Sequence, residues 1–301
     1  MSASSPLITW NVDDWTGYQG HMAEPDENGV RWFVQHAQGW WGGTGIRNND
    51  QDRSGSDGAY FAPPDRAARV ITLSGTADCP DEAAMELAMD QFTALLSDRA
   101  MHTLTVGELT RTRQADVHLG ADPAVDPTDS SEFDFELTVI AVDPLKYGAD
   151  LHVDQTGLAQ DAPGGIQWNG PAGTTGVIWN APGGLVYQGD NGNTGVLLLE
   201  NNGSAATPVR FAISGPVNAP SIVDVTNGNR ITYPDFVPSG SQLVIDTGTG
   251  YAALDGANRY PQLTSRGFFK IPKKSAIEVA FRSSTPSPSA VLTAAWRDAW
   301  Y

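Results

Sequence analysis

Hydrophobic and polar residues alternate in short runs along the first half of the chain. A period of two residues is typical of strands that bury one face and expose the other. Turn-forming glycine, proline and aspartate separate the runs. The strands that this pattern predicts are residues 5–20 (a strand and a turn), 29–36, 69–75, 101–106, 109–119 and 132–142. The two runs 101–106 and 109–119 predict a hairpin.

A single segment of the first half has helical spacing instead. Its apolar positions are Met85, Met89, Phe92 and Leu96. These positions share one face of a helix that we expect to run from Pro80 to about Asp98. Proline suits the first helical turn, where its missing N–H has no partner to bond. The apolar face predicts core packing rather than a cofactor site.

A long stretch from Gly39 to Gly58 shows little periodicity and is rich in glycine and aspartate. A loop of this length inside a domain is usually functional, so we interpret residues 39–58 as an interaction arm. The candidate interface residues are Trp40, Trp41, Arg47, Asp50 and Asp52. Tryptophan is enriched in binding hot spots. The alternative is that the two tryptophans cover their own domain.

Short apolar segments, separated by glycine, asparagine and aspartate every 8–12 residues or so, fill the second half. This spacing predicts a β-sandwich. The run Asp143–Gly148 punctuates the chain between the halves. We therefore expect a mainly β protein with two domains, 1–147 and 148–301. The first would be β-sandwich-like with one helix.

Charge supports the same division. Residues 1–145 hold 24 Asp and Glu against 8 Arg and no Lys, whereas residues 146–301 hold 11 acidic against 10 basic side chains. The net charges are therefore −16 and −1. A first half this acidic excludes a general nucleic-acid binder, because phosphate affinity needs clustered Lys and Arg. It suits the wall of a channel that DNA crosses without sticking.

No pattern of catalytic or metal-binding residues stands out. The single cysteine, Cys79, excludes an intrachain disulfide. The five histidines lack the spacing of a zinc site, and the sequence has neither a nucleophile elbow nor a phosphate-binding loop. Asp134 and Glu136 share a strand face, which keeps a glycoside or peptidoglycan hydrolase as an alternative. We expect no enzyme, metal or cofactor.

Two further expectations concern sugars and membranes. Trp168, Trp179 and Tyr187 would form a sugar-stacking platform if they were exposed on the second domain, although such aromatics more often belong to a core. This keeps a carbohydrate-binding module as another alternative. The sequence has no basic and apolar leader and no run of 18 apolar residues. We expect synthesis in a cytoplasm and no membrane insertion.

The order of these elements resembles that of siphophage distal tail proteins. Arg69–Gly75 followed by the helix resembles the strand and helix of that family, and Phe133–Tyr147 resembles its long strand ending in Asp-Pro-Leu-Lys-Tyr. Val209–Pro216, Gln242–Thr247 and Gly267–Pro272 follow the pattern of its galectin-like domain. The ending Leu292–Tyr301 is similar to that of minor tail proteins of phages that infect actinobacteria.

The resemblance implies a structural protein of the virion tail tip. It implies a homo-hexameric ring, built by the first domain, at the distal end of the tail tube, with galectin-like second domains around it. The implied partners are the tail tube protein, the tape measure protein, and tail-tip hub or receptor-binding proteins. DNA would pass through the ring without specific binding.

Overall fold

The computed structural model describes residues 8–20, 23–159 and 194–301. The chain divides into two compact units, one made of Met1–Asp150 with Asp298–Tyr301 and the other of Leu151–Arg297. The division at residues 147 and 148 that the sequence predicts would put residues 298–301 in the second domain. They lie in the first unit because β27 (Ala299–Trp300) pairs with β13 (Lys146–Gly148).

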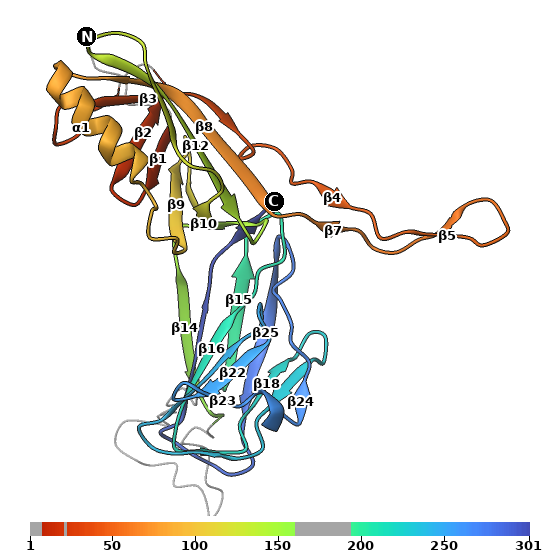
Figure 1. The fold of residues 1–301 in the computed structure, drawn as a ribbon. Helices are drawn as coiled ribbons and strands as arrows, with labels where there is room; N and C mark the ends of the chain where they lie inside the picture. Colours follow the sequence, from red (N-terminus) through yellow and green to blue (C-terminus); the bar gives the residue numbers. More distant parts are fainter. Residues whose placement is uncertain (1–7, 21–22, 160–193) are drawn as a thin grey trace, which may run out of the picture. The chain divides into compact units, whose positions relative to one another are not determined.

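A seven-stranded barrel forms the first unit (Figure 1). Its strands, in spatial order, are β12 (Glu132–Ala141), β8 (Arg69–Asp78), β3 (Arg31–Gln38), β2 (Trp15–Gln19), β1 (Ile8–Val12), β9 (His102–Gly107) and β10 (Thr112–Leu119). The pairing of β10 with β12 closes the sheet. Every neighbouring pair is antiparallel except β2 with β3. β11 (Ala124–Pro127) flanks β12.

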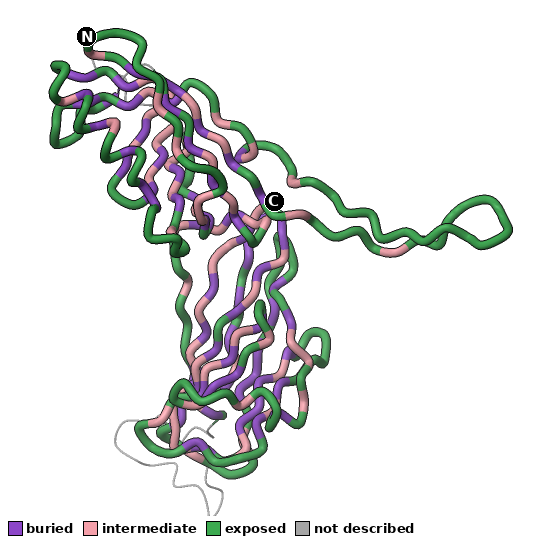
Figure 2. The backbone as a smooth tube through the Cα atoms, in the orientation of Figure 1, coloured by how far each residue is buried: buried purple, intermediate pink, exposed green. Residues whose placement is uncertain are grey.

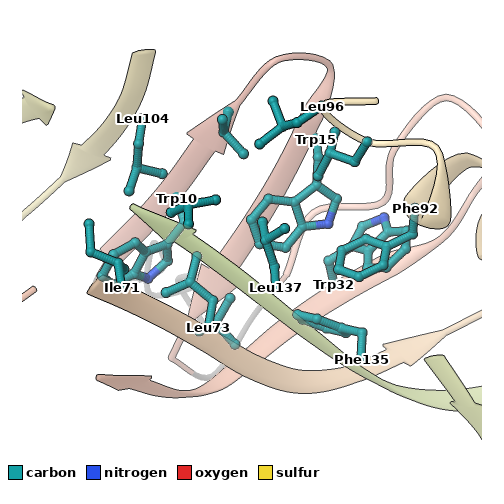
Figure 3. Packing of buried hydrophobic residues seen from close by; sticks show 14 of the residues in the cluster. Trp10, Trp15, Trp32, Ile71, Leu73, Phe92, Leu96, Leu104, Phe135 and Leu137 are labelled. Carbon is teal, nitrogen blue, oxygen red and sulfur yellow. The ribbon is translucent and has the colours of Figure 1, made fainter. Parts of the chain in front are cut away.

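Alternation along the strands fills the barrel, as the sequence pattern predicted. On β12, Phe133, Phe135 and Leu137 are buried, while Asp134 and Glu136 between them are exposed. Figure 3 shows Phe135 beside Trp15, Trp32 and Phe92. The Trp32 and Phe92 rings stack with their centroids 5.3 Å apart, and Trp15 meets Phe92 edge-on at 5.9 Å. These aromatics join the helix to the barrel.

The helix that the sequence predicted is present as α1 (Glu82–Thr93) and is shorter than expected. The Asp81 side chain caps it by accepting a 2.8 Å hydrogen bond from the Ala84 N–H, so Pro80 precedes the helix. Met85 and Phe92 are buried, and Met89 is partly buried against the same core. Leu96, also buried, lies beyond the helix end with a positive φ.

The second unit contains two antiparallel sheets. One consists, in spatial order, of β14 (His152–Gly157), β26 (Val291–Trp296), β16 (Arg210–Ser214), β21 (Gln242–Asp246), β22 (Tyr251–Leu254) and β23 (Ala257–Asn258). The other consists of β15 (Val196–Asn201), β25 (Ser275–Arg282), β18 (Ser221–Asp224), β19 (Arg230–Thr232) and β24 (Ser265–Arg266). A small ribbon pairs β17 (Val217–Asn218) with β20 (Phe236–Val237), and Tyr260–Gln262 form a 3-10 turn.

Side chains from both sheets share one core. Phe211 and Leu243 come from the first sheet, and Leu199, Val279 and Phe281 come from the second. The unit is therefore a β-sandwich, and the mainly β fold with one α-helix among the described residues confirms the predicted fold class.

Within the part of the chain that the structure describes, no helix is long and apolar enough to cross a membrane. No group of three or more His, Cys, Asp or Glu among those same residues is arranged to hold a metal ion. Figure 2 shows instead one extended feature that is exposed along almost its whole length, between β3 and β8.

Candidate interaction surface at the arm

This exposed feature is a long two-stranded arm that leaves the barrel after β3 and returns to it at β8 (Figure 1). Near the barrel, β4 (Ile46–Arg47) pairs with β7 (Asp65–Arg66). Further out, β5 (Gln51–Asp52) pairs with β6 (Ala59–Tyr60). The sequence had predicted an arm over 39–58. The structure extends it to residue 68, because the return strand is part of the same ribbon.

Polar side chains of the arm bond to the arm itself. The Asn49 amide donates to the Pro63 carbonyl at 2.9 Å and to the Asp65 carboxylate at 3.0 Å. The Asp50 carboxylate accepts a 2.9 Å hydrogen bond from the Ala62 N–H. Asp50, one of the predicted interface residues, therefore helps to set the arm's own conformation.

Apolar side chains of the arm have no core to enter. Every residue from Gly45 to Phe61 is exposed. Ile46 is 67%, Tyr60 64% and Phe61 81% exposed. Arg47 and Asp52, both predicted interface residues, lie exposed on the same ribbon. A two-stranded ribbon is marginally stable alone in water. Exposed apolar side chains on such a ribbon are typical of a protein-binding surface.

The two predicted tryptophan anchors have different environments. Trp40 is completely buried, and its indole N–H donates to the Glu108 carboxylate at 3.0 Å. Its ring meets Trp10 edge-on at 5.9 Å, so it covers its own barrel, which is the alternative that the sequence left open. Trp41 is 48% exposed and lies 6.5 Å from Trp10. Of the pair, Trp41 is the side chain available to a partner.

Two buried cations hold the root of the arm. Arg69 donates to the carbonyls of Gly39 at 2.6 Å and Gly42 at 2.9 Å, where the arm departs. Its other N–H groups donate to the Pro144 carbonyl at 3.0 and 3.1 Å. The Lys146 ammonium donates to the Trp40 carbonyl at 2.9 Å. These bonds fix the departing and returning strands of the arm at one point of the barrel.

Gly39 is required where the arm departs. Its φ is +86°, a conformation that side chains disfavour. A Cβ at this position would lie 1.9 Å from the Val70 carbonyl oxygen, which is far inside van der Waals contact. The close approach lets the Gly39 carbonyl reach Arg69.

A buried ion pair completes the root. The Arg113 guanidinium pairs with the Glu108 carboxylate, with its Nε 2.8 Å from Glu108 Oε1. Burial opposes ionisation of Glu108, but hydrogen bonds from Arg113, Trp40 and Arg111 outweigh it and hold the Glu108 pKa below its ordinary value. Burial, and then the nearby Arg113 and Arg69 charges, lower the pKa of Lys146 to about 7.

The sequence pattern does not mark Arg69, Glu108, Arg113 or Lys146 as residues of one site. Glu108 and Arg113 are close in the sequence, in the hairpin of β9 and β10, but Arg69 and Lys146 come from distant segments that only the tertiary structure brings beside them. A partial signal was present for two of them, since Arg69 lies between Ala68 and Val70 and Lys146 lies between Leu145 and Tyr147. Isolated charges in such strands are buried when they are paired.

The remaining candidates do not form a described site. Trp168, Trp179 and Tyr187 lie outside the described residues. Asp134 and Glu136 are exposed on β12 and line an open hollow of about 290 Å³ together with Asp126. Cys79 is buried, and burial, with the nearby acidic side chains of Asp78, Asp26 and Asp81, raises its thiol pKa to about 11. This thiol is therefore not an activated nucleophile.

Comparison with known proteins identifies the architecture. No protein-family model matches the sequence, and no curated protein matches it. Among solved structures, the chain is similar to the SPP1 Dit (gp 19.1) protein, described as a paradigm of the hub adsorption apparatus in phages that infect Gram-positive bacteria. The TM-score is 0.62 at 11% identity, over 98% of this chain and 100% of that chain.

The fold is that of SPP1 Dit. The similarity covers both units and not the barrel alone. A chain in the activated, calcium-containing baseplate structure of phage P2 is also similar, with a TM-score of 0.49 and 13% identity over 96% of this chain and 98% of that chain.

Proposed function

We propose that this protein is a structural component of a siphophage tail tip, without catalytic activity. It forms a homo-hexameric ring at the distal end of the tail tube. The observation that carries the proposal is the similarity to the Dit hub protein over the whole chain. Fold alone does not assign function, so the exposed arm supplies a second, local argument.

The arm supports ring formation. Rings arise when one surface of a subunit binds a different surface of the next and the rotation closes. A ribbon with exposed Ile46, Tyr60 and Phe61 and with unpaired strand edges can add to a neighbour's sheet. Trp41, at the base of the ribbon, provides an aromatic anchor.

Charge supports the passage of DNA. The net charge of −16 lies in the first 145 residues, which form most of the barrel unit. A ring built from such units repels the phosphate backbone and lets DNA slide without binding. A structure of the assembled ring with basic residues on its inner wall would contradict this part of the proposal.

In this proposal the two units bind different partners. The barrel unit contacts its own copies and the tail tube, and the nearly neutral sandwich unit holds the tail-tip hub or receptor-binding proteins. The tape measure protein would occupy the channel. The protein would be made in the host cytoplasm and end in the virion tail tip. The second unit is proposed to be galectin-like.

Shortening the arm tests the proposal. The Ala67 N–H donates to the Gly45 carbonyl at 2.8 Å, so two glycines can replace residues 46–66 while this bond and the Arg69 contacts to Gly39 and Gly42 are kept. We expect rings of about six copies for the wild type and monomers for the shortened protein, measured by light-scattering mass and negative-stain images. Phe61→Ser should also lower the fraction of protein that forms rings, because it removes an exposed apolar side chain of the arm.

Leu87→Ser is the matched control, because Leu87 is 46% exposed on α1 and lies away from the arm in the sequence. It should leave the mass unchanged. A shortened arm that still forms rings would remove the arm from the interface. A wild type that stays monomeric at every concentration and does not assemble on isolated tail tubes would contradict the ring itself.

The carbohydrate-binding alternative rests on Trp168, Trp179 and Tyr187, outside the described residues. It stays a prediction, which glycan-array binding by the purified protein would test.

A further inference from the structure

The chain passes between its two units twice, and both passages border the root of the arm. It leaves the barrel unit after β13, at Asp150, and returns to it at Asp298, just before β27. β13 and β27 pair with each other, with Lys146 opposite Trp300. The Lys146 side chain of that pair also bonds to the Trp40 carbonyl of the departing arm.

The terminal strand touches the arm and the buried ion pair. The Tyr301 ring lies under the Arg66 guanidinium at 3.9 Å, and Arg66 belongs to β7, the returning strand of the arm. The Trp300 ring lies 5.2 Å from the Arg111 guanidinium and 5.8 Å from that of Arg113. Cation–π contacts of this kind stabilise packed elements.

These contacts form a closed circuit. The departing arm is bonded to Lys146, Lys146 lies opposite Trp300, and Tyr301 contacts the returning arm. Arg69 provides a second link between the arm and β13, since it donates to the Gly39 carbonyl of the arm and to the Pro144 carbonyl just before β13. Displacing β27 removes its pairing with β13 and the contact of Tyr301 with the returning arm.

Several residues of this set of contacts are charged and buried, so moving their partners away would leave buried charges without hydrogen bonds. Arg69, Arg113 and Lys146 are 1%, 4% and 2% exposed. Glu108 is the carboxylate that the described structure pairs with Arg113. Buried charges of this kind are stable only while the carbonyl oxygens and the carboxylate that contact them stay in place. An opening that moves these groups is therefore costly in free energy.

We propose that Arg69, Glu108, Arg113 and Lys146, together with strand β27, form a latch that couples the arm to the two connections between the units. When β27 is displaced, the root of the arm is released. When the arm is held by a partner, β27 and β13 are held as well, because coupling between two sites is reciprocal. The latch is a property of the single chain and does not depend on the ring.

Hydrogen exchange measured by mass spectrometry on the full chain tests the latch. Trp300→Ala and Tyr301→Ala should each raise exchange at the arm root, residues 39–45 and 65–69, by about fivefold or more, because local opening becomes easier. The shortened arm, with two glycines for residues 46–66, should in turn raise exchange at Lys146–Gly148. The ends of this variant remain bridged by Ala67 and Gly45.

Tyr260→Ala is the matched control. Tyr260 carries an Arg266 guanidinium 4.7 Å from its ring in the second unit, so the variant removes an equivalent aromatic–arginine contact away from the latch. It should leave the arm root unchanged. The latch is excluded if Trp300→Ala and Tyr301→Ala raise exchange only in β27 and β13. It is equally excluded if the shortened arm leaves Lys146–Gly148 unaffected. Tyr301→Ala keeps the test decisive if Trp300→Ala fails to fold.

Discussion

At the scale of single residues, the most consequential group is a set of charges that the barrel buries. Lys146 is 2% exposed and is bonded to the Trp40 carbonyl. Burial is the main cause of its lowered pKa, and the Arg113 and Arg69 charges add to it. A buried cation near other cations lowers the stability of the folded state wherever it must carry its proton.

Lys146 therefore predicts a pH dependence. Its folded pKa of about 7 lies below its ordinary value of 10.5, so between these values the unfolded chain binds more protons. Stability should rise with pH across that window, by about 1.4 kcal/mol per pH unit at most. Lys146→Met removes this contribution, because methionine does not titrate.

The measurement is the free energy of unfolding of the wild type and of Lys146→Met at pH 7, 8 and 9. The difference between the proteins isolates Lys146, since all other titrating groups are shared. We expect it to shift in favour of the wild type by about 2 kcal/mol from pH 7 to 9. A difference that stays constant would mean that Lys146 titrates normally.

At the scale of elements, the helix and the arm differ in where their apolar side chains lie. α1 buries a stripe that includes Met85 and Phe92, and a side-chain cap begins it. The arm exposes its apolar side chains and has no core. The helix is stabilised by its own unit, whereas the arm's apolar residues are available for a partner.

Phe92 is the residue through which the helix is expected to stabilise the barrel. It stacks on Trp32 and contacts Trp15 and Phe135 (Figure 3). Phe92→Ala should lower the free energy of unfolding by about 3–5 kcal/mol, because it removes a buried ring and leaves a cavity. Leu87→Ala, on the exposed side of the same helix, should cost less than about 1 kcal/mol. If urea denaturation gave the same loss of unfolding free energy for both variants, the aromatic cluster would have repacked around the missing Phe92 ring.

At the scale of the whole molecule, each of the two units has its own hydrophobic core. One contains the aromatic cluster around Trp32, and the other contains Phe211 and Phe281. Each core draws on strands of its own unit only. Separate cores are the usual basis for separate unfolding.

We therefore expect two transitions in thermal or urea denaturation. Phe92→Ala should lower the midpoint of one, and Phe281→Ala, which removes a fully buried ring of the second core, should lower the midpoint of the other. Fluorescence and far-UV circular dichroism would follow the two steps. One cooperative transition, shifted equally by both variants, would show that the units unfold together.

The sequence by itself determined the elements whose cause is local. The alternation along Glu132–Ala141, the helical stripe with Met85 and Phe92, and the hairpin of His102–Gly107 with Thr112–Leu119 could all be predicted from periodicity and turn residues. The mainly β class and the exposed arm were also predictable, because a long glycine-rich and aspartate-rich segment has too few apolar residues to build a core.

Only the tertiary structure decided which strands meet. Closure through β10 and β12 turns the first sheet into a barrel, and the return of β27 assigns the last residues to the first unit. The tertiary packing also buries Trp40, leaves Trp41 exposed, and brings Arg69 and Lys146 beside the pair of Glu108 and Arg113. Local periodicity encodes the face of a strand but not its distant neighbours, so the apolar surroundings of Arg69 and Lys146 in the sequence could not show that the two residues meet.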